Sequence, residues 1–149
     1  PNVQRCPMST LTVGEVIPET AVRFSRADLR AYAQASGDHN PIHLDEAVAT
    51  AVGLPGVIAH GMLTMGHAAR LVGEVAGAVG AVRAISVRFT RPVVVPADDA
   101  YPSFAEVVFS GNVTAVDEEA GLATIAITAT CNGQTVLARA QATVSLPTT

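Results

Sequence analysis

The stretch HGMLTMGHAARLVGEV, residues 60–75, decides the fold of this chain. Its periodicity is helical, but apolar side chains occupy nearly every face, which is typical of a buried helix. Gly61, Gly66 and Gly73 lower its intrinsic helix propensity, so tertiary packing must stabilise it. We therefore predict a long central helix that the rest of the chain covers.

The sequence that follows this helix changes to the periodicity of β-strands. Four stretches are rich in β-branched residues and partly alternate in polarity, namely 84–95, 103–116, 122–131 and 136–146. Residues 117–121 and 132–133 are typical of hairpin turns. Pro92 and Pro96 suit an edge strand or a bend. An antiparallel sheet wrapped around one buried helix is the α+β fold that this order predicts.

Two shorter helices are predicted before the central one. Ser25 and Asp28 form a capping-box pattern at the start of a helix that ends at Ser36-Gly37. A short second helix is predicted from Asp45 to Val52, with Asp45 as its cap and Gly53 as the residue that stops it. We expect residues 1–10 to be an irregular N-terminal extension, since Met8 is a plausible initiator, and residues 11–149 to form a single domain.

The composition excludes several classes of function. The 149 residues are 49% hydrophobic, and surplus apolar surface often lies in a subunit interface. The net charge of −4 argues against nucleic-acid binding. All nine basic residues are arginine, which excludes a Schiff-base or P-loop lysine. No apolar run could span a bilayer and no signal peptide is evident, so we expect a cytoplasmic protein with reduced Cys6 and Cys131.

A loop between the first two helices carries the candidate chemistry. It contains Ser36-Gly37-Asp38-His39-Asn40-Pro41-Ile42-His43, and its proline disfavours a regular helix. Asp38 and His43 supply a carboxylate and an imidazole, which together transfer protons near neutral pH. Each alone could be structural, but the pair on one loop beside the central helix favours catalysis. Asn40 either orients one of them through its amide or only holds the turn.

The start of the central helix is the second candidate element. Its first N–H groups have no intrahelical partner, so the Gly61 N–H could stabilise an oxyanion. Close packing of the helix on a strand would explain this glycine equally well. His60 is expected to be a hydrogen-bonding neighbour of the loop. A metal site on His39 and His43 is disfavoured, because Pro41 separates them and no third ligand has suitable spacing.

Taken together, these residues resemble the signature of the MaoC-like (R)-specific enoyl-thioester hydratases, the hydratase 2 group of hot-dog-fold proteins. The likeness covers about residues 11–146 and includes Tyr32-Ala33-x-x-Ser36-Gly37-Asp38-x-Asn40-Pro41-Ile42-His43, Ala59-His60-Gly61-Met62 and Val87-Arg88-Phe89-x-x-Pro92-Val93. Within the group, the run at residues 59–66 resembles the mycobacterial-type catalytic subunit of 3-hydroxyacyl-carrier-protein dehydratase. That subunit pairs with a partner that lacks the catalytic loop.

The resemblance implies a role for each candidate residue. Asp38 and His43 would form the catalytic dyad, with Asn40 as its orienting amide and the Gly61 N–H as oxyanion donor. Residues implied to bind substrate are His60, Met62 and Arg88. Arg88 is more simply interpreted as a solvated strand residue, and so are Arg83 and Arg91. The more specific alternative is that these arginines clamp a phosphate group.

The implied reaction is the reversible hydration of trans-2-enoyl thioesters to (3R)-3-hydroxyacyl thioesters in fatty acid or polyketide metabolism. No metal or other cofactor is expected. The sequence leaves open whether acyl carrier protein or coenzyme A carries the acyl group, and whether the chain pairs with itself or with a related hot-dog subunit. It also leaves open which of Asp38 and His43 is the acid. The alternatives are a thioesterase of the same fold and a non-catalytic partner subunit.

Overall fold

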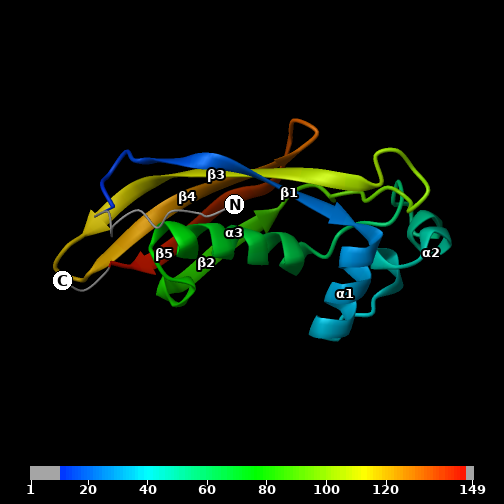
Figure 1. Ribbon diagram of the computed structural model, residues 1–149, viewed down its shortest axis with the longest axis horizontal. Helices are drawn as coiled ribbons and strands as arrows, with labels where there is room; N and C mark the ends of the chain where they lie inside the picture. The colour runs from blue at the N-terminus through cyan, green and yellow to red at the C-terminus, as the bar shows by residue number, and fades with distance from the viewer. Residues whose placement is uncertain (1–10, 147–149) are drawn as a thin grey trace, which may run out of the picture.

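The protein is described by a computed structural model over residues 11–146, and the extension expected at residues 1–10 lies outside this part. A five-stranded antiparallel sheet in the order β1-β3-β4-β5-β2 curves over the helix α3 (Figure 1). The strands are β1 Val16–Ser25, β2 Val82–Phe89, β3 Phe104–Asp117, β4 Leu122–Cys131 and β5 Gln134–Ser145. The helices are α1 Arg26–Ser36, α2 Glu46–Ala51 and α3 Gly61–Val75, with the short 3-10 turns Pro41–His43 and Val79–Ala81. This arrangement confirms the predicted α+β hot-dog fold.

The strand β1 was not predicted. It pairs with β3 at one edge of the sheet, and its register shifts between Ile17 and Thr20, on either side of Pro18. Only Ile17 and Phe24 of this strand are buried, so its apolar residues do not alternate clearly. An edge strand exposes both faces over part of its length, which explains why the period-2 pattern is weak here.

The prediction for the strand after α3 was wrong at its far end. A strand was expected to continue to Val95, but β2 ends at Phe89. Pro92 has no N–H to donate to a ladder, and further along Val94 forms an isolated bridge with Ile58 instead of continuing β2. The prolines therefore lie in an extended connection after the strand, although β2 is an edge strand as expected.

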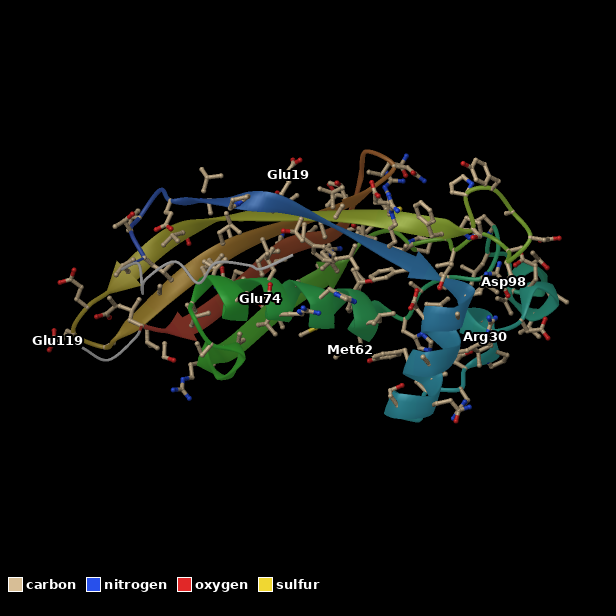
Figure 2. The ribbon with its side chains drawn as sticks, viewed as in Figure 1. Glu19, Arg30, Met62, Glu74, Asp98 and Glu119 are labelled. Carbon is tan, nitrogen blue, oxygen red and sulfur yellow. The ribbon has the colours of Figure 1, made fainter. Side chains whose placement is uncertain are left out.

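The core lies between the concave face of the sheet and one side of α3. Thr64, Ala68, Leu71 and Val72 are buried on the helix. Ala68, Leu71 and Val72 pack in one cluster with sheet residues that include Phe109, and a buried side chain of the size of Phe109 contributes about 1.5–3 kcal/mol. The prediction that α3 would be buried on all sides was wrong. Met62 is 58% exposed at its start and points away from the sheet (Figure 2).

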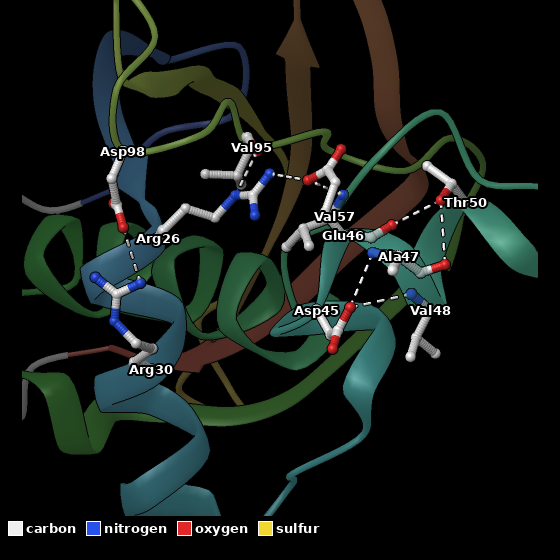
Figure 3. Close-up of polar contacts among 10 residues, drawn as sticks. All are labelled: Arg26, Arg30, Asp45, Glu46, Ala47, Val48, Thr50, Val57, Val95 and Asp98. Carbon is white, nitrogen blue, oxygen red and sulfur yellow. Dashed lines mark hydrogen bonds and ion pairs between the residues drawn. The ribbon is translucent and has the colours of Figure 1, made fainter.

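Local caps fix both helices that flank the candidate loop, as predicted. The Ser25 side chain accepts the Asp28 N–H at 3.3 Å, while the Asp28 carboxylate accepts the Ser25 N–H at 2.8 Å. Gly37 ends α1 with a φ of 78°, a left-handed conformation that glycine adopts without a steric penalty. The Asp45 side chain accepts the N–H groups of Ala47 and Val48 at the start of α2 (Figure 3).

Arg26 ties the two flanking helices together. Its Nε donates to the Val95 carbonyl at 2.7 Å, and its guanidinium also pairs with Glu46 at the start of α2 (Figure 3). Arg30 of α1 pairs with Asp98 at 3.1 Å. These contacts brace both ends of the candidate loop against the segment that follows β2. No helix within residues 11–146 is long and apolar enough to cross a membrane. Cys131 is a buried free thiol.

Candidate active site

A chain of side-chain-to-backbone hydrogen bonds holds the loop after α1. Ser36 Oγ accepts the Asp38 N–H at 3.2 Å, and Asp38 Oδ1 accepts the Asn40 N–H at 3.2 Å. Asn40 Oδ1 in turn accepts the Ile42 N–H at 3.3 Å. Such bonds two residues ahead are how Asp, Asn and Ser stabilise turns. Asn40 therefore holds the turn with its side chain and holds Asp38 with its backbone.

The same turn buries His43. Pro41 begins a single 3-10 turn that ends at His43, whose side chain is only 8% exposed, whereas Asp38 is exposed. The loop was predicted to be irregular, and this was wrong for residues 41–43, which form the turn. Pro41 suits the first position of a helical turn because it has no N–H that would need an acceptor there. His43 Nδ1 lies 2.8 Å from the Ile58 carbonyl oxygen. A carbonyl oxygen only accepts, so Nδ1 carries the hydrogen and the Nε2 lone pair of the neutral ring is free to accept a proton.

His60 lies directly against His43. The two rings stack with centroids 4.0 Å apart and an angle of 28° between their planes, and the Tyr32 ring lies 4.8 Å from His60. The His60 side chain is 1% exposed, and its Nε2 donates to the Asp38 carbonyl at 3.1 Å. Its Nδ1 has no hydrogen-bond partner among residues 11–146. Burial lowers the pKa of His60, and the neighbouring His43 lowers it further against the opposing effect of the Asp38 carbonyl.

Asp38, His43 and His60 meet as a three-group cluster. One side-chain ligand atom of each lies within 4.8 Å of the others. Groups at this spacing can share a water molecule or hold a divalent cation. His43 and His60 each use one ring nitrogen on a backbone carbonyl, which orients the ring for either purpose. The expectation of no metal stays a prediction.

A cavity joins His43 to the start of α3. Its volume is about 290 Å³. It is lined by His43, Ile58, Ala59, Gly61, Thr64, Phe89, Thr90, Arg91, Pro92, Val93, Val136 and Leu137. The Gly61 N–H begins the helix and has no intrahelical acceptor. A Cβ at Gly61 would lie 3.0 Å from Cε1 of Phe89. Gly61 therefore packs closely against Phe89 and also lines the cavity, and its role as an oxyanion donor stays a prediction.

The structure separates the residues expected to bind substrate. His60 lies behind His43 rather than on the cavity wall, and neither Met62 nor Arg88 lines the cavity. The arginine at the wall is Arg91, two residues after β2. Thr64, only 3% exposed, also lines the cavity and was missed. Its position three residues after Gly61, on the same face of a helix, was the available signal.

Comparisons with known proteins agree on one family. The family model for the MaoC like domain matches residues 9–101. The chain is 48% identical over 80 residues to 3-hydroxyacyl-thioester dehydratase X of Mycobacterium tuberculosis, a match that covers 54% of this chain and 28% of that protein. It is 32% identical over 126 residues to the (R)-specific enoyl-CoA hydratase of Aeromonas caviae, covering 84% of this chain and 88% of that protein.

Solved structures give the same result. A MaoC-like dehydratase superposes with a TM-score of 0.85 at 36% identity, over 92% of this chain and 41% of that one. The chain thus spans less than half of that structure and 28% of the mycobacterial relative, but most of the Aeromonas enzyme.

Proposed function

This chain belongs to the MaoC-like domain family, and from that membership we propose that it interconverts trans-2-enoyl thioesters and (3R)-3-hydroxyacyl thioesters. One observation carries the proposal. A proton acceptor, His43 Nε2, and a helix-start N–H donor, that of Gly61, lie on one cavity, with the Asp38 carboxylate beside the acceptor. Addition of water to an enoyl thioester needs these groups, namely a base for the water and a donor for the enolate oxygen.

We assign the oxyanion role to the Gly61 N–H. The thioester carbonyl accepts a hydrogen bond from it, and this bond strengthens as negative charge develops on the oxygen when water adds to C3. Donors of this kind typically contribute about 10²–10³ in turnover. The start of α3 adds the positive end of the helix dipole, which also favours negative charge at this position.

Asp38 and His43 act on the water. The water oxygen bonds to C3 while one of its protons passes to the pair, and the pair returns a proton to C2 to give the 3-hydroxyacyl thioester. Dehydration reverses each step, and neither side chain forms a covalent bond to substrate. His43 Nε2 is the acceptor in the resting ring, because Nδ1 donates to the Ile58 carbonyl. Asn40 acts on this pair by holding the loop.

A single assay tests the reaction class. The protein is mixed with crotonyl-pantetheine, and the enone absorbance and the free thiol are followed together. The proposal expects loss of enone absorbance, no release of thiol, and a product of R configuration at C3. Release of thiol would identify a thioesterase of the same fold instead, and no change with or without a partner subunit would identify a non-catalytic subunit.

We further propose that a second hot-dog subunit, either a copy of this chain or a related one, packs beside the cavity. Large apolar side chains are exposed at the start of α3 and around the end of β2, namely Met62 at 58%, Phe89 at 49% and Val94 at 37%. Such a patch beside a site is typical of a subunit interface. Native mass spectrometry of the chain alone should give a dimer if it pairs with itself. We also propose that the protein acts in the cytoplasm.

A further inference from the structure

Thr64 carries a buried hydroxyl group that the reaction proposed above does not use. The residue lies three positions after Gly61, is 3% exposed, and lines the same cavity as Gly61 and His43. A hydroxyl in such a place is expected to have a hydrogen-bond partner, because leaving it without one in the interior is costly. The partner of this hydroxyl therefore bears on what the cavity binds.

The helix α3 does not supply the partner. The other serine and threonine side chains of the described α-helices, Ser36 and Thr50, each donate to the backbone carbonyl four residues earlier, at 2.7 and 2.8 Å. For Thr64 that carbonyl belongs to His60. It already accepts the Leu63 N–H at 3.1 Å and the Thr64 N–H at 3.3 Å. A carbonyl oxygen has two lone pairs, so both are occupied before the hydroxyl can use one.

The Thr64 hydroxyl is instead open to the cavity. It makes no hydrogen bond to another residue within residues 11–146, and the only side-chain nitrogen or oxygen in that part which is closed off from solvent without a partner is His60 Nδ1. The hydroxyl is therefore accessible, and the cavity is the space that the Thr64 side chain lines. Thr90 lines the same cavity, but its hydroxyl already donates to the Thr135 carbonyl at 2.8 Å. Thr64 thus offers the cavity a donor that no other described residue uses.

Thr64 and Gly61 present their donors to one part of the cavity. Residues three apart lie on the same face of a helix, and a helical side chain leans toward the N-terminus, over the turn that precedes it. For Thr64 that turn begins at Gly61, which has no side chain to stand between the hydroxyl and a ligand. The cavity volume is about 290 Å³, so a group that accepts the Gly61 N–H has little room to lie out of reach of Thr64.

Building on the proposed hydratase function, we propose that the Thr64 hydroxyl is a second hydrogen-bond donor to the thioester carbonyl oxygen, beside the Gly61 N–H. This oxygen only accepts hydrogen bonds, and its lone pairs can take two donors as negative charge develops on it. The water that adds to C3 is held by Asp38 and His43 instead. A hydrogen bond to the enolate oxygen is charge-assisted, so it is stronger in the transition state than in the bound substrate. Thr64 is therefore a catalytic residue that acts on kcat more than on KM.

The kinetic experiment compares Thr64→Val, which removes the hydroxyl, with Thr64→Ser, which keeps it. For hydration of crotonyl-pantetheine, Thr64→Val should lower kcat about 10- to 100-fold and change KM by less than about three-fold, since a hydrogen bond to a charged group contributes a factor of this order. Thr64→Ser should recover most of the loss. Thr50→Val is the matched control, because Thr50 lies on α2 and does not line the cavity, and its kcat should stay within about two-fold of wild type.

Urea unfolding distinguishes this role from a structural one. The hydroxyl has no partner among the described residues, so its removal should leave the unfolding midpoint of Thr64→Val equal to that of wild type or above it. A lower midpoint would show that the hydroxyl is bonded within the folded protein, and would overturn the proposal.

Infrared spectroscopy tests the contact with the substrate directly. Crotonyl-pantetheine with an isotopic label at the thioester carbonyl is bound to the Asp38→Asn protein, in which turnover is slow, with and without Thr64→Val. A donated hydrogen bond lowers the carbonyl stretching frequency, so loss of the Thr64 donor should move the band of the bound thioester to higher frequency. An unshifted band, or a Thr64→Val enzyme with wild-type kcat, would overturn the proposal. If wild type does not hydrate the substrate, the hydratase function fails instead, and the band of the thioester bound to wild type and to Thr64→Val still shows whether Thr64 donates to it.

Discussion

Replacing His60 by phenylalanine separates the two contacts of this buried ring, its stacking on His43 and its hydrogen bond to Asp38. The ring stacks on His43 at 4.0 Å, and its Nε2 donates to the Asp38 carbonyl at 3.1 Å. His60→Phe keeps an aromatic ring against His43 but removes the hydrogen bond that holds Asp38. It also removes Nδ1, a buried nitrogen without a partner among the described residues.

The effect on stability follows from two opposing terms. The lost hydrogen bond costs about 0.5–1.5 kcal/mol, while removing a buried polar atom that lacks a partner returns about 1–3 kcal/mol. The Asp38 carbonyl belongs to an exposed residue, so water can take the place of the imidazole. We therefore expect the free energy of unfolding of His60→Phe to equal that of wild type or to rise by about 1 kcal/mol. His60→Ala should instead lose about 3 kcal/mol, because it leaves a cavity.

The effect on activity is opposite in sign to the effect on stability. Without the hydrogen bond the Asp38 backbone moves relative to His43, and a misplacement of about 1 Å can cost about 10²-fold in rate. We expect kcat for hydration of crotonyl-pantetheine to fall about 10- to 100-fold in His60→Phe, with unfolding by urea unchanged or slightly later. His67→Phe is the control, since His67 of α3 lies between Phe24 and Phe109, away from the site. A His60→Phe enzyme with wild-type kcat would refute the positioning role of His60.

Further predictions concern pH, packing and metal. Burial lowers the pKa values of both His60 and His67 below their ordinary 6.5, so the unfolded chain binds protons more readily there and stability should fall as pH drops through and below about 6.5. Urea unfolding at pH 7.5 and 5.5 measures this fall in stability. A His60→Phe, His67→Phe double variant should show a smaller fall. An equal fall in the double variant would mean that other groups cause it. Gly111→Ala should destabilise the fold by about 1–3 kcal/mol, since its Cβ would lie 2.5 Å from the Ala126 carbonyl oxygen, whereas Gly66→Ala, with nothing within 4 Å, should gain up to about 1 kcal/mol. Thermal unfolding compares the two, and a neutral Gly111→Ala would contradict the described approach of β3 and β4. Treatment with EDTA should leave kcat unchanged, and a loss that zinc restores would show that Asp38, His43 and His60 hold a metal.

Features that depend on neighbours in sequence could be predicted. The capping box at Ser25, the cap at Asp45 and the start of α3 were each predicted within about a residue, because caps act within one turn of a helix. The loop that carries Asp38 and His43 was also recognised, because proline and the polar side chains around it restrict the backbone locally.

Features that depend on long-range packing could not be predicted. Burial of His43 requires the Ile58 carbonyl and the His60 ring, which lie 15 and more residues further along the chain. Arg91 rather than Arg88 lines the cavity wall because β2 ends at Phe89. Pro92 interrupts the strand pairing at this point only once the sheet has formed, so the end of β2 could not be read from the sequence alone. The edge strand β1 lacks a strong alternation, so its pairing with β3 has no clear signal in the sequence.

The turnover of Asp38→Asn tests the proposed chemistry most directly. Asparagine has the same shape and keeps an oxygen to accept the Asn40 N–H, which Asp38 Oδ1 accepts at 3.2 Å. The substitution therefore removes the charge and the proton-accepting capacity but not the turn. We expect kcat for hydration of crotonyl-pantetheine to fall at least about 100-fold, with the free energy of unfolding changed by less than about 0.5 kcal/mol. A folded Asp38→Asn protein that retains more than about a tenth of wild-type turnover would contradict the proposed role of this carboxylate.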